Sequence, residues 1–160
     1  MANRALVNAA VLLALASVGC GGTEDRQEPR VSVASALTNV HVLQDVSTLF
    51  CLDSNASGTA YALGCNDGNF QNWSMQTINS LGWLQLVDAQ TRRCLQSNPA
   101  GNVSAQLCTG GNFQHWVMSS NGTSVYFRDV ATGFCLDSDT SGKLSTLPCN
   151  GGASQSWIIR

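Results

Sequence analysis

Beyond Val18, hydrophobic and polar positions alternate in short stretches that end at clusters of turn-forming residues. No window in this part of the chain has the apolar period of 3.6 residues that marks an amphipathic helix. Runs of about four to six mostly apolar or alternating residues are instead followed by Ser, Asn, Asp and Gly, as in 54–58, 97–101 and 138–142. Such runs between turn clusters predict strands. The folded part is therefore expected to be all-β.

One arrangement of residues occurs three times along the chain. Each copy has a Gln-x-Trp motif, a cysteine six residues before the Gln, a second cysteine fourteen residues earlier, and an Asp six residues before that. The copies are offset by 43 and 41 residues, and a unit of this size cannot bury a core alone. We therefore expect three units that share one core, over repeats of about 43–82, 83–124 and 125–160. The tryptophans expected to point into it are Trp73, Trp116 and Trp157.

Seven cysteines in 160 residues point to an oxidising compartment. Six of them belong to the repeats, and six cysteines can pair in about fifteen ways. Only one pairing is local and also the same in every copy. It joins Cys51 to Cys65, Cys94 to Cys108, and Cys135 to Cys149. Each bridge would close a loop of about fifteen residues, which is expected to stabilise the fold by ~3 kcal/mol.

The seventh cysteine, Cys20, follows a mostly apolar run that is too short to span a membrane comfortably. This run predicts a signal peptide over residues 1–19. Gly19 before Cys20 resembles the processing site of bacterial lipoproteins, which would make Cys20 the lipid-bearing N-terminus. Because Ser17 stands where that group usually has Leu, ordinary cleavage after a small residue is the alternative. Residues 20–37 are expected to form a flexible tether, so the protein is predicted to be exported, either as a cell-envelope lipoprotein anchored in the membrane or as a secreted protein.

Only 11% of the residues are charged, and the formal net charge is −2. From Thr38 onward the chain has no Glu and few cations, so it lacks a basic surface to attract phosphates and nucleic acid is a poor partner. A surface rich in Asn, Gln, Ser and Thr suits neutral polar ligands such as sugars, although any soluble β protein with many turns has a similar composition. No catalytic constellation and no Cys/His cluster with metal spacing is visible. We expect neither enzymatic activity nor a metal or cofactor.

Three Gln-x-Trp units, each with a Cys-Leu strand and a local disulfide, resemble the ricin-type β-trefoil lectin family. The resemblance extends from Leu43 to Arg160. It implies a β-trefoil of twelve strands over residues 38–160, with a six-stranded barrel capped by three hairpins. It also implies binding of glycans or polysaccharides, and we expect the protein to be monomeric.

In that family the sugar site of a repeat centres on an Asp directly after Cys-Leu. This position holds Asp53 in the first repeat and Asp137 in the third, but the neutral Gln96 in the second. The position of the stacking aromatic ring, two residues before the second cysteine, holds Leu63, Gln106 and Leu147. The sugar site is therefore expected to be rearranged or lost. The candidate carbohydrate-binding residues are Asp53, Tyr61, Asn69, Phe70, Gln71, Asp137 and Gln155.

Two alternatives remain open at this stage. An Asp beside a turn can cap its own backbone, and the Gln of each Gln-x-Trp is expected to fix a loop rather than to contact a ligand. The leading hypothesis is a carbohydrate-binding module displayed on a bacterial cell envelope. The other is a β-trefoil without a sugar site that binds protein, for instance as a protease inhibitor or an assembly component.

Overall fold

A computed structural model describes residues 40–160. The predicted signal peptide, the tether and Cys20 lie outside the described residues. Each repeat supplies four strands and one 3-10 turn. The elements are β1 (Val40–Asp45), β2 (Phe50–Ser54), β3 (Ala60–Gly64), η2 (Asn69–Gln71), β4 (Asn72–Thr77), β5 (Trp83–Asp88), β6 (Cys94–Gln96), β7 (Ser104–Gln106), η3 (Asn112–Gln114), β8 (Trp116–Asn121), β9 (Ser124–Asp129), β10 (Cys135–Ser138), β11 (Leu144–Leu147), η4 (Ala153–Gln155) and β12 (Trp157–Ile159).

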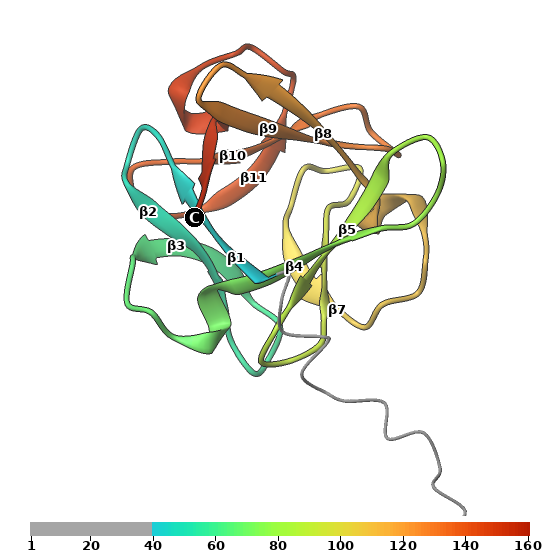
Figure 1. Cartoon of the computed structure of the whole chain (residues 1–160), viewed down its shortest axis with the longest axis horizontal. Coiled ribbons are helices and arrows are strands. Elements are labelled where there is room, and N and C mark those ends of the chain that lie inside the picture. The colour runs from blue at the N-terminus through green and yellow to red at the C-terminus, as the bar shows by residue number, and fades with distance from the viewer. Residues whose placement is uncertain (1–39) are drawn as a thin grey trace, which may run out of the picture. The chain divides into compact units, whose positions relative to one another are not determined.

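Six strands form a closed antiparallel ring (Figure 1). Strand β1 pairs with β4, β4 with β5, β5 with β8, β8 with β9, β9 with β12, and β12 returns to β1. The remaining strands form three hairpins, β2–β3, β6–β7 and β10–β11. This is a β-trefoil, and it confirms the predicted all-β fold of three equivalent units.

The three tryptophans of the Gln-x-Trp motifs are fully buried, as predicted. Each indole also donates a hydrogen bond to the leucine carbonyl that follows the first cysteine of its own repeat. The Nε1–O distances are 3.0 Å from Trp73 to Leu52, 3.1 Å from Trp116 to Leu95, and 3.3 Å from Trp157 to Leu136. Each Trp therefore fills the shared core and ties its repeat's hairpin to the barrel.

Neighbouring repeats are joined at the glycine that stands seven residues after each first cysteine. The carbonyl oxygens of Gly58, Gly101 and Gly142 accept hydrogen bonds of 2.8–2.9 Å from the backbone of the next repeat in the ring. All three glycines have a positive φ, and a Cβ on any of them would collide with a backbone oxygen of that neighbour. Only glycine allows so close an approach.

The predicted cysteine pairing is confirmed. Cys51–Cys65, Cys94–Cys108 and Cys135–Cys149 are disulfides, each with a sequence separation of 14. Each bridge joins the first hairpin strand of its repeat to the segment that follows the second strand. Within residues 40–160 no helix has the length and apolar character needed to cross a membrane.

Candidate functional site

The Gln side chain of each Gln-x-Trp holds the loop that follows the second cysteine. In the first repeat, Gln71 Oε1 accepts from the backbone nitrogen of Asn66 at 2.9 Å, and Gln71 Nε2 donates to the Gly64 carbonyl at 3.2 Å. Gln114 and Gln155 make the same two contacts in their repeats. All three side chains are buried. These contacts support the positioning role expected from the sequence.

In the first repeat most of the predicted site residues lie on β2 and on the two elements that contact it, β3 and η2. Asp53 on β2 lies directly opposite Tyr61 on β3. The turn η2, which contains Asn69, Phe70 and Gln71, packs against β2. The Tyr61 hydroxyl donates to the carbonyl of Ser54 at 3.3 Å. A carboxylate, a phenol and a phenyl ring thus belong to neighbouring elements of one repeat.

Asp53 is only 4% exposed, and its surroundings affect its ionisation. Burial raises the pKa of the Asp53 carboxyl, and hydrogen bonding to the Gln71 side chain partly opposes this shift. Burial and the adjacent Asp53 also raise the pKa of Tyr61. The Gln71 side chain, which holds the loop after Cys65, therefore also affects the ionisation of the carboxyl group at the predicted centre of the site.

In the third repeat, Asp137 on β10 lies opposite Ser145 on β11 and is 7% exposed. Its Oδ2 accepts a hydrogen bond of 3.1 Å from the Ser154 hydroxyl on η4. Ser154 stands where the first repeat has Phe70. The third repeat therefore keeps the carboxylate but has a small polar partner in place of the ring.

The second repeat contains an open groove of about 430 Å³. It is lined by the residues at the family's Asp position, at the polar position opposite it and at the stacking position, together with three neighbours. These residues are Gln96, Ser104, Gln106, Arg93, Leu107 and Thr109. The groove thus lies at the family's sugar position. It belongs to the repeat in which the sequence, with Gln96 in place of Asp, made sugar binding least expected.

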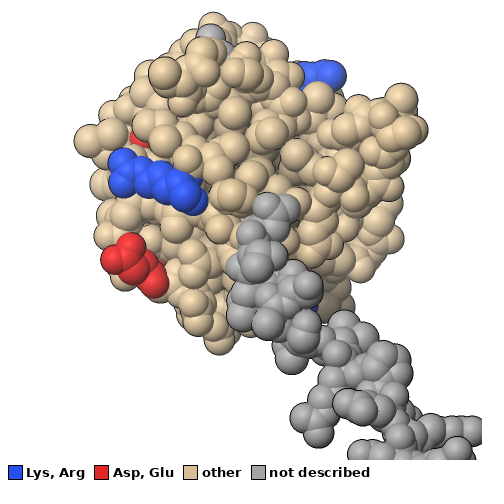
Figure 2. Space-filling view, in the orientation of Figure 1, with Lys and Arg blue, Asp and Glu red and all other residues tan. Residues whose placement is uncertain are grey.

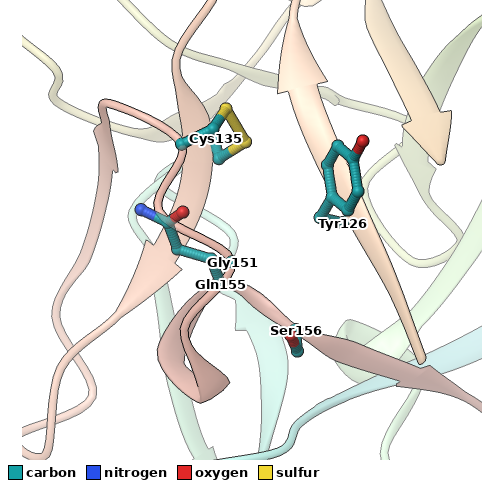
Figure 3. Close-up of a pocket in the computed structure, with 6 residues that line it drawn as sticks. Tyr126, Cys135, Gly151, Gln155 and Ser156 are labelled. Carbon is teal, nitrogen blue, oxygen red and sulfur yellow. A yellow bond between two sulfur atoms is a disulfide. The ribbon is translucent and has the colours of Figure 1, made fainter. Parts of the chain in front are cut away.

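A second pocket, of about 300 Å³, lies beside the disulfide of the third repeat (Figure 3). Tyr126 on β9 lies across it from Cys135, and Cys149, Gly151, Gln155 and Ser156 complete the lining. Of the predicted site residues only Gln155 borders this pocket, and its amide already bonds backbone groups. Neither of the two pockets is lined by Asp53 or Asp137.

One face of the domain carries little charge. Figure 2 shows one face on which few acidic or basic side chains appear among the other residues. No cluster of three or more His, Cys, Asp or Glu in residues 40–160 could hold a metal ion. Amide and hydroxyl side chains line both pockets, and such groups can form hydrogen bonds with a polar ligand.

The family pattern of the ricin-type beta-trefoil lectin domain matches residues 39–157. The chain belongs to this family. Membership supports carbohydrate binding in general terms. No curated protein sequence gives a significant match.

Solved structures with the same fold include the designed threefold-symmetric protein ThreeFoil, with a TM-score of 0.70, 23% identity, and coverage of 76% of this chain and 97% of that one. SeviL, solved bound to the asialo-GM1 saccharide, has a TM-score of 0.66 and 14% identity, with 76% and 96% covered. An exo-β-1,3-galactanase from Clostridium thermocellum has a TM-score of 0.70 and 18% identity, with 76% of this chain but 30% of that chain covered. At these identities the likeness shows the fold alone. The expected absence of enzymatic activity stays a prediction.

Sequence reasoning did not single out Arg93, Leu107, Thr109 or Tyr126. A signal for Arg93 was nevertheless present, because the residue before the first cysteine is Phe50 in the first repeat and Phe134 in the third. An arginine in one of three equivalent positions marks that repeat as chemically different.

Proposed function

We propose that this protein is a carbohydrate-binding module displayed on a bacterial cell envelope, and that it acts as a monomer. The observation that carries the proposal is the first repeat of a ricin-type lectin domain, in which Asp53 faces Tyr61 and η2 packs against the same strand. A carboxylate accepts hydrogen bonds from neighbouring sugar hydroxyls, and an aromatic ring covers an apolar sugar face.

Within this site, Asp53 is the principal polar contact. Tyr61 and Phe70 are both partly exposed, and they provide the apolar contact that Leu63 cannot supply by ring stacking. Asn69 is exposed on η2 and adds a neutral hydrogen-bonding group. Gln71 acts by positioning, because it is fully buried and bonded to the loop backbone.

The third repeat forms a second and simpler site. Asp137 is its carboxylate, Ser154 holds that carboxylate, and Gln155 fixes the loop beside it. Single shallow sugar sites are weak, so engagement of two repeats by one polymer would raise the apparent affinity. Display on the envelope rests on the signal-like residues 1–19 and on Cys20, and it would hold the lectin domain at a surface where polysaccharides are abundant.

A glycan array probed with the full chain tests the proposal. We expect binding to a defined set of glycans, and competition by the free sugar should abolish it. The alternative is a protein-binding β-trefoil, favoured by exposed leucines such as Leu81 and Leu107, each 72% exposed. The absence of binding across a broad array would reject the carbohydrate-binding proposal in favour of this alternative.

A further inference from the structure

In the groove of the second repeat, Gln96 offers a hydrogen-bond donor where the other repeats have a carboxylate acceptor, and Arg93 offers a cation where they have Phe. We infer that this groove binds an anionic saccharide, in which Arg93 and Gln96 hold the carboxylate or sulfate group. The inference rests on the proposed carbohydrate-binding function and assigns a ligand class to a repeat that lacks the family's Asp.

The orientation of Gln96 follows from a chain of hydrogen bonds that begins at the backbone. The nitrogen of Thr109 can only donate, so the atom of Gln114 that it contacts at 2.8 Å is the amide oxygen. Gln114 Nε2 is therefore a donor, and it bonds the Leu107 carbonyl at 2.7 Å and Gln96 Oε1 at 3.0 Å. With its oxygen held in this way, Gln96 has its Nε2 donor left for a ligand.

Arg93 adds the charge. It lines the same groove as Gln96, and within residues 40–160 no carboxylate forms an ion pair with it. One guanidinium nitrogen lies 3.5 Å from where a Cβ of Gly58 would stand, so the side chain is flanked by the turn of the first repeat. A planar guanidinium can bind a carboxylate through two parallel hydrogen bonds.

Two differences between the repeats both make the groove of the second repeat more positively charged. Relative to the first repeat, Gln96 replaces Asp53 and removes a negative charge, while Arg93 replaces Phe50 and adds a positive one. A carboxylate at position 96 would repel an anionic ligand. The neutral amide does not, and the cation of Arg93 lines the same groove.

The rest of the groove suits a sugar ring. Ser104 lies opposite Gln96 across the hairpin, and Gln106 lies opposite Cys94; both can bond hydroxyl groups. Leu107 is 72% exposed at the groove and offers an apolar surface for the ring's C–H face. A volume of about 430 Å³ falls within the range of small-ligand sites.

Two pairs of matched polymers test the inference by biolayer interferometry on the full chain. Polygalacturonate is compared with its methyl ester, which lacks the charge, and dextran sulfate is compared with dextran. We expect binding to at least one anionic polymer, at least about tenfold weaker binding to its neutral partner, and weakening as salt rises. The first pair reports a carboxylate ligand and the second a sulfate.

Variants connect the binding to the groove. Arg93→Gln and Gln96→Asp should each reduce binding of the anionic polymer at least about tenfold. The affinity of Arg93→Lys should lie between those of Arg93→Gln and the wild type, because Lys keeps the charge but lacks the two parallel donors of the guanidinium. Arg128→Gln removes an exposed cation elsewhere and should leave binding unchanged. Thermal unfolding of every variant separates loss of the site from loss of the fold.

The outcomes are distinguishable from those of the general proposal. If charged and neutral polymers bind equally, or if folded Arg93→Gln binds as the wild type does, the anionic-ligand inference is overturned while carbohydrate binding stands. The same holds if neutral glycans bind on an array and neither anionic polymer does. Failure of every glycan would overturn both.

Discussion

Ser54 donates a hydrogen bond of 2.8 Å to Oδ2 of Asp88 and so joins the hairpin of the first repeat to a barrel strand of the second. Both groups are buried. The other oxygen of Asp88 holds a turn of its own repeat by accepting from the backbone nitrogen and the hydroxyl of Thr91. One buried carboxylate therefore stabilises both a local turn and the junction between two repeats.

Removal of the Ser54 hydroxyl should destabilise the fold. Ser54→Ala leaves Asp88 Oδ2 buried without its donor, which typically costs ~1–3 kcal/mol. Ser97→Ala is the matched control, because Ser97 occupies the same position in the second repeat and its buried Oγ makes no hydrogen bond. Denaturant unfolding should show a clear loss for the first variant and little change for the second. Equal losses would show that the Ser54 contact has no special role.

The glycine at the inter-repeat contact leads to a second stability prediction. Gly142→Ala would place a Cβ against the carbonyl of Ala62 and strain a backbone with φ of 81°. Gly122→Ala imposes a similar strain at φ of 70° but meets nothing within 4 Å. Both variants should lose ~1–2 kcal/mol of unfolding free energy because their backbone is left-handed at this residue. In urea unfolding, Gly142→Ala should show a clearly larger loss of stability than Gly122→Ala. The difference between the two losses measures the close contact between repeats.

These two cases show what could be predicted from the sequence. The spacing of Cys, Gly, Gln and Trp is set by contacts that recur in every repeat, so the fold, the three disulfides and the buried tryptophans could be read from it. The Ser54–Asp88 contact could not be predicted, because nothing in the sequence around either residue indicates that its partner lies in another repeat. The glycine could be recognised as part of the pattern, but its close approach to the next repeat is visible only in three dimensions.

The candidate site was harder to predict for a related reason. Asp53, Tyr61 and η2 could be grouped from the family pattern, since each keeps its place relative to a cysteine or to the Gln. The groove at Arg93 departs from that pattern. Its donor character depends on which way the amides of Gln114 and Gln96 point, and this follows from the backbone nitrogen of Thr109.

Burial of two carboxyl groups predicts how stability depends on pH. Burial raises the pKa of Asp45 and of Asp53 above the usual 3.8. Such a group contributes most to stability below its unfolded pKa, and this contribution is lost as pH rises through the higher folded pKa. Asp53→Asn removes the penalty of burying a charge, so the variant should gain stability relative to the wild type at pH 7 and lose that advantage near pH 4.

Thermal unfolding of both proteins at the two pH values checks this prediction. The comparison is made as the difference between wild type and variant, because other groups titrate in both proteins alike. Asp139 is one such group, since hydrogen bonding from Ser141 lowers its pKa. A variant advantage that is larger near pH 4 than at pH 7 would contradict a raised pKa for Asp53.

Cys20 provides a test of envelope display that is independent of the lectin domain. If Cys20 carries acyl chains, Cys20→Ser should move the protein from the membrane fraction to the soluble fraction and abolish labelling with a fatty-acid probe. Two or more acyl chains give stable attachment, whereas one chain gives only marginal binding. If the variant remains in the membrane fraction as the wild type does, Cys20 is not the anchor.

The carboxylates of the first and third repeats should contribute separately to binding of a glycan found on the array. Sugar hydroxyls exchange water for protein hydrogen bonds, so neutral contacts yield ~0.5–1.5 kcal/mol and contacts to a charged group roughly 1.5–3 kcal/mol. Asp53→Ala should therefore weaken binding at the first repeat by about tenfold to a hundredfold. Asp137→Ala should reduce binding at the third repeat, and the two losses should add, because the sites lie in different repeats and share no partner.

Isothermal titration with a monovalent sugar measures each site without avidity, and Asp139→Ala, an exposed turn carboxylate, is the control. If the folded double variant Asp53→Ala, Asp137→Ala binds the array glycan as tightly as the wild type, neither carboxylate forms the site, and the groove at Arg93 would be the remaining candidate.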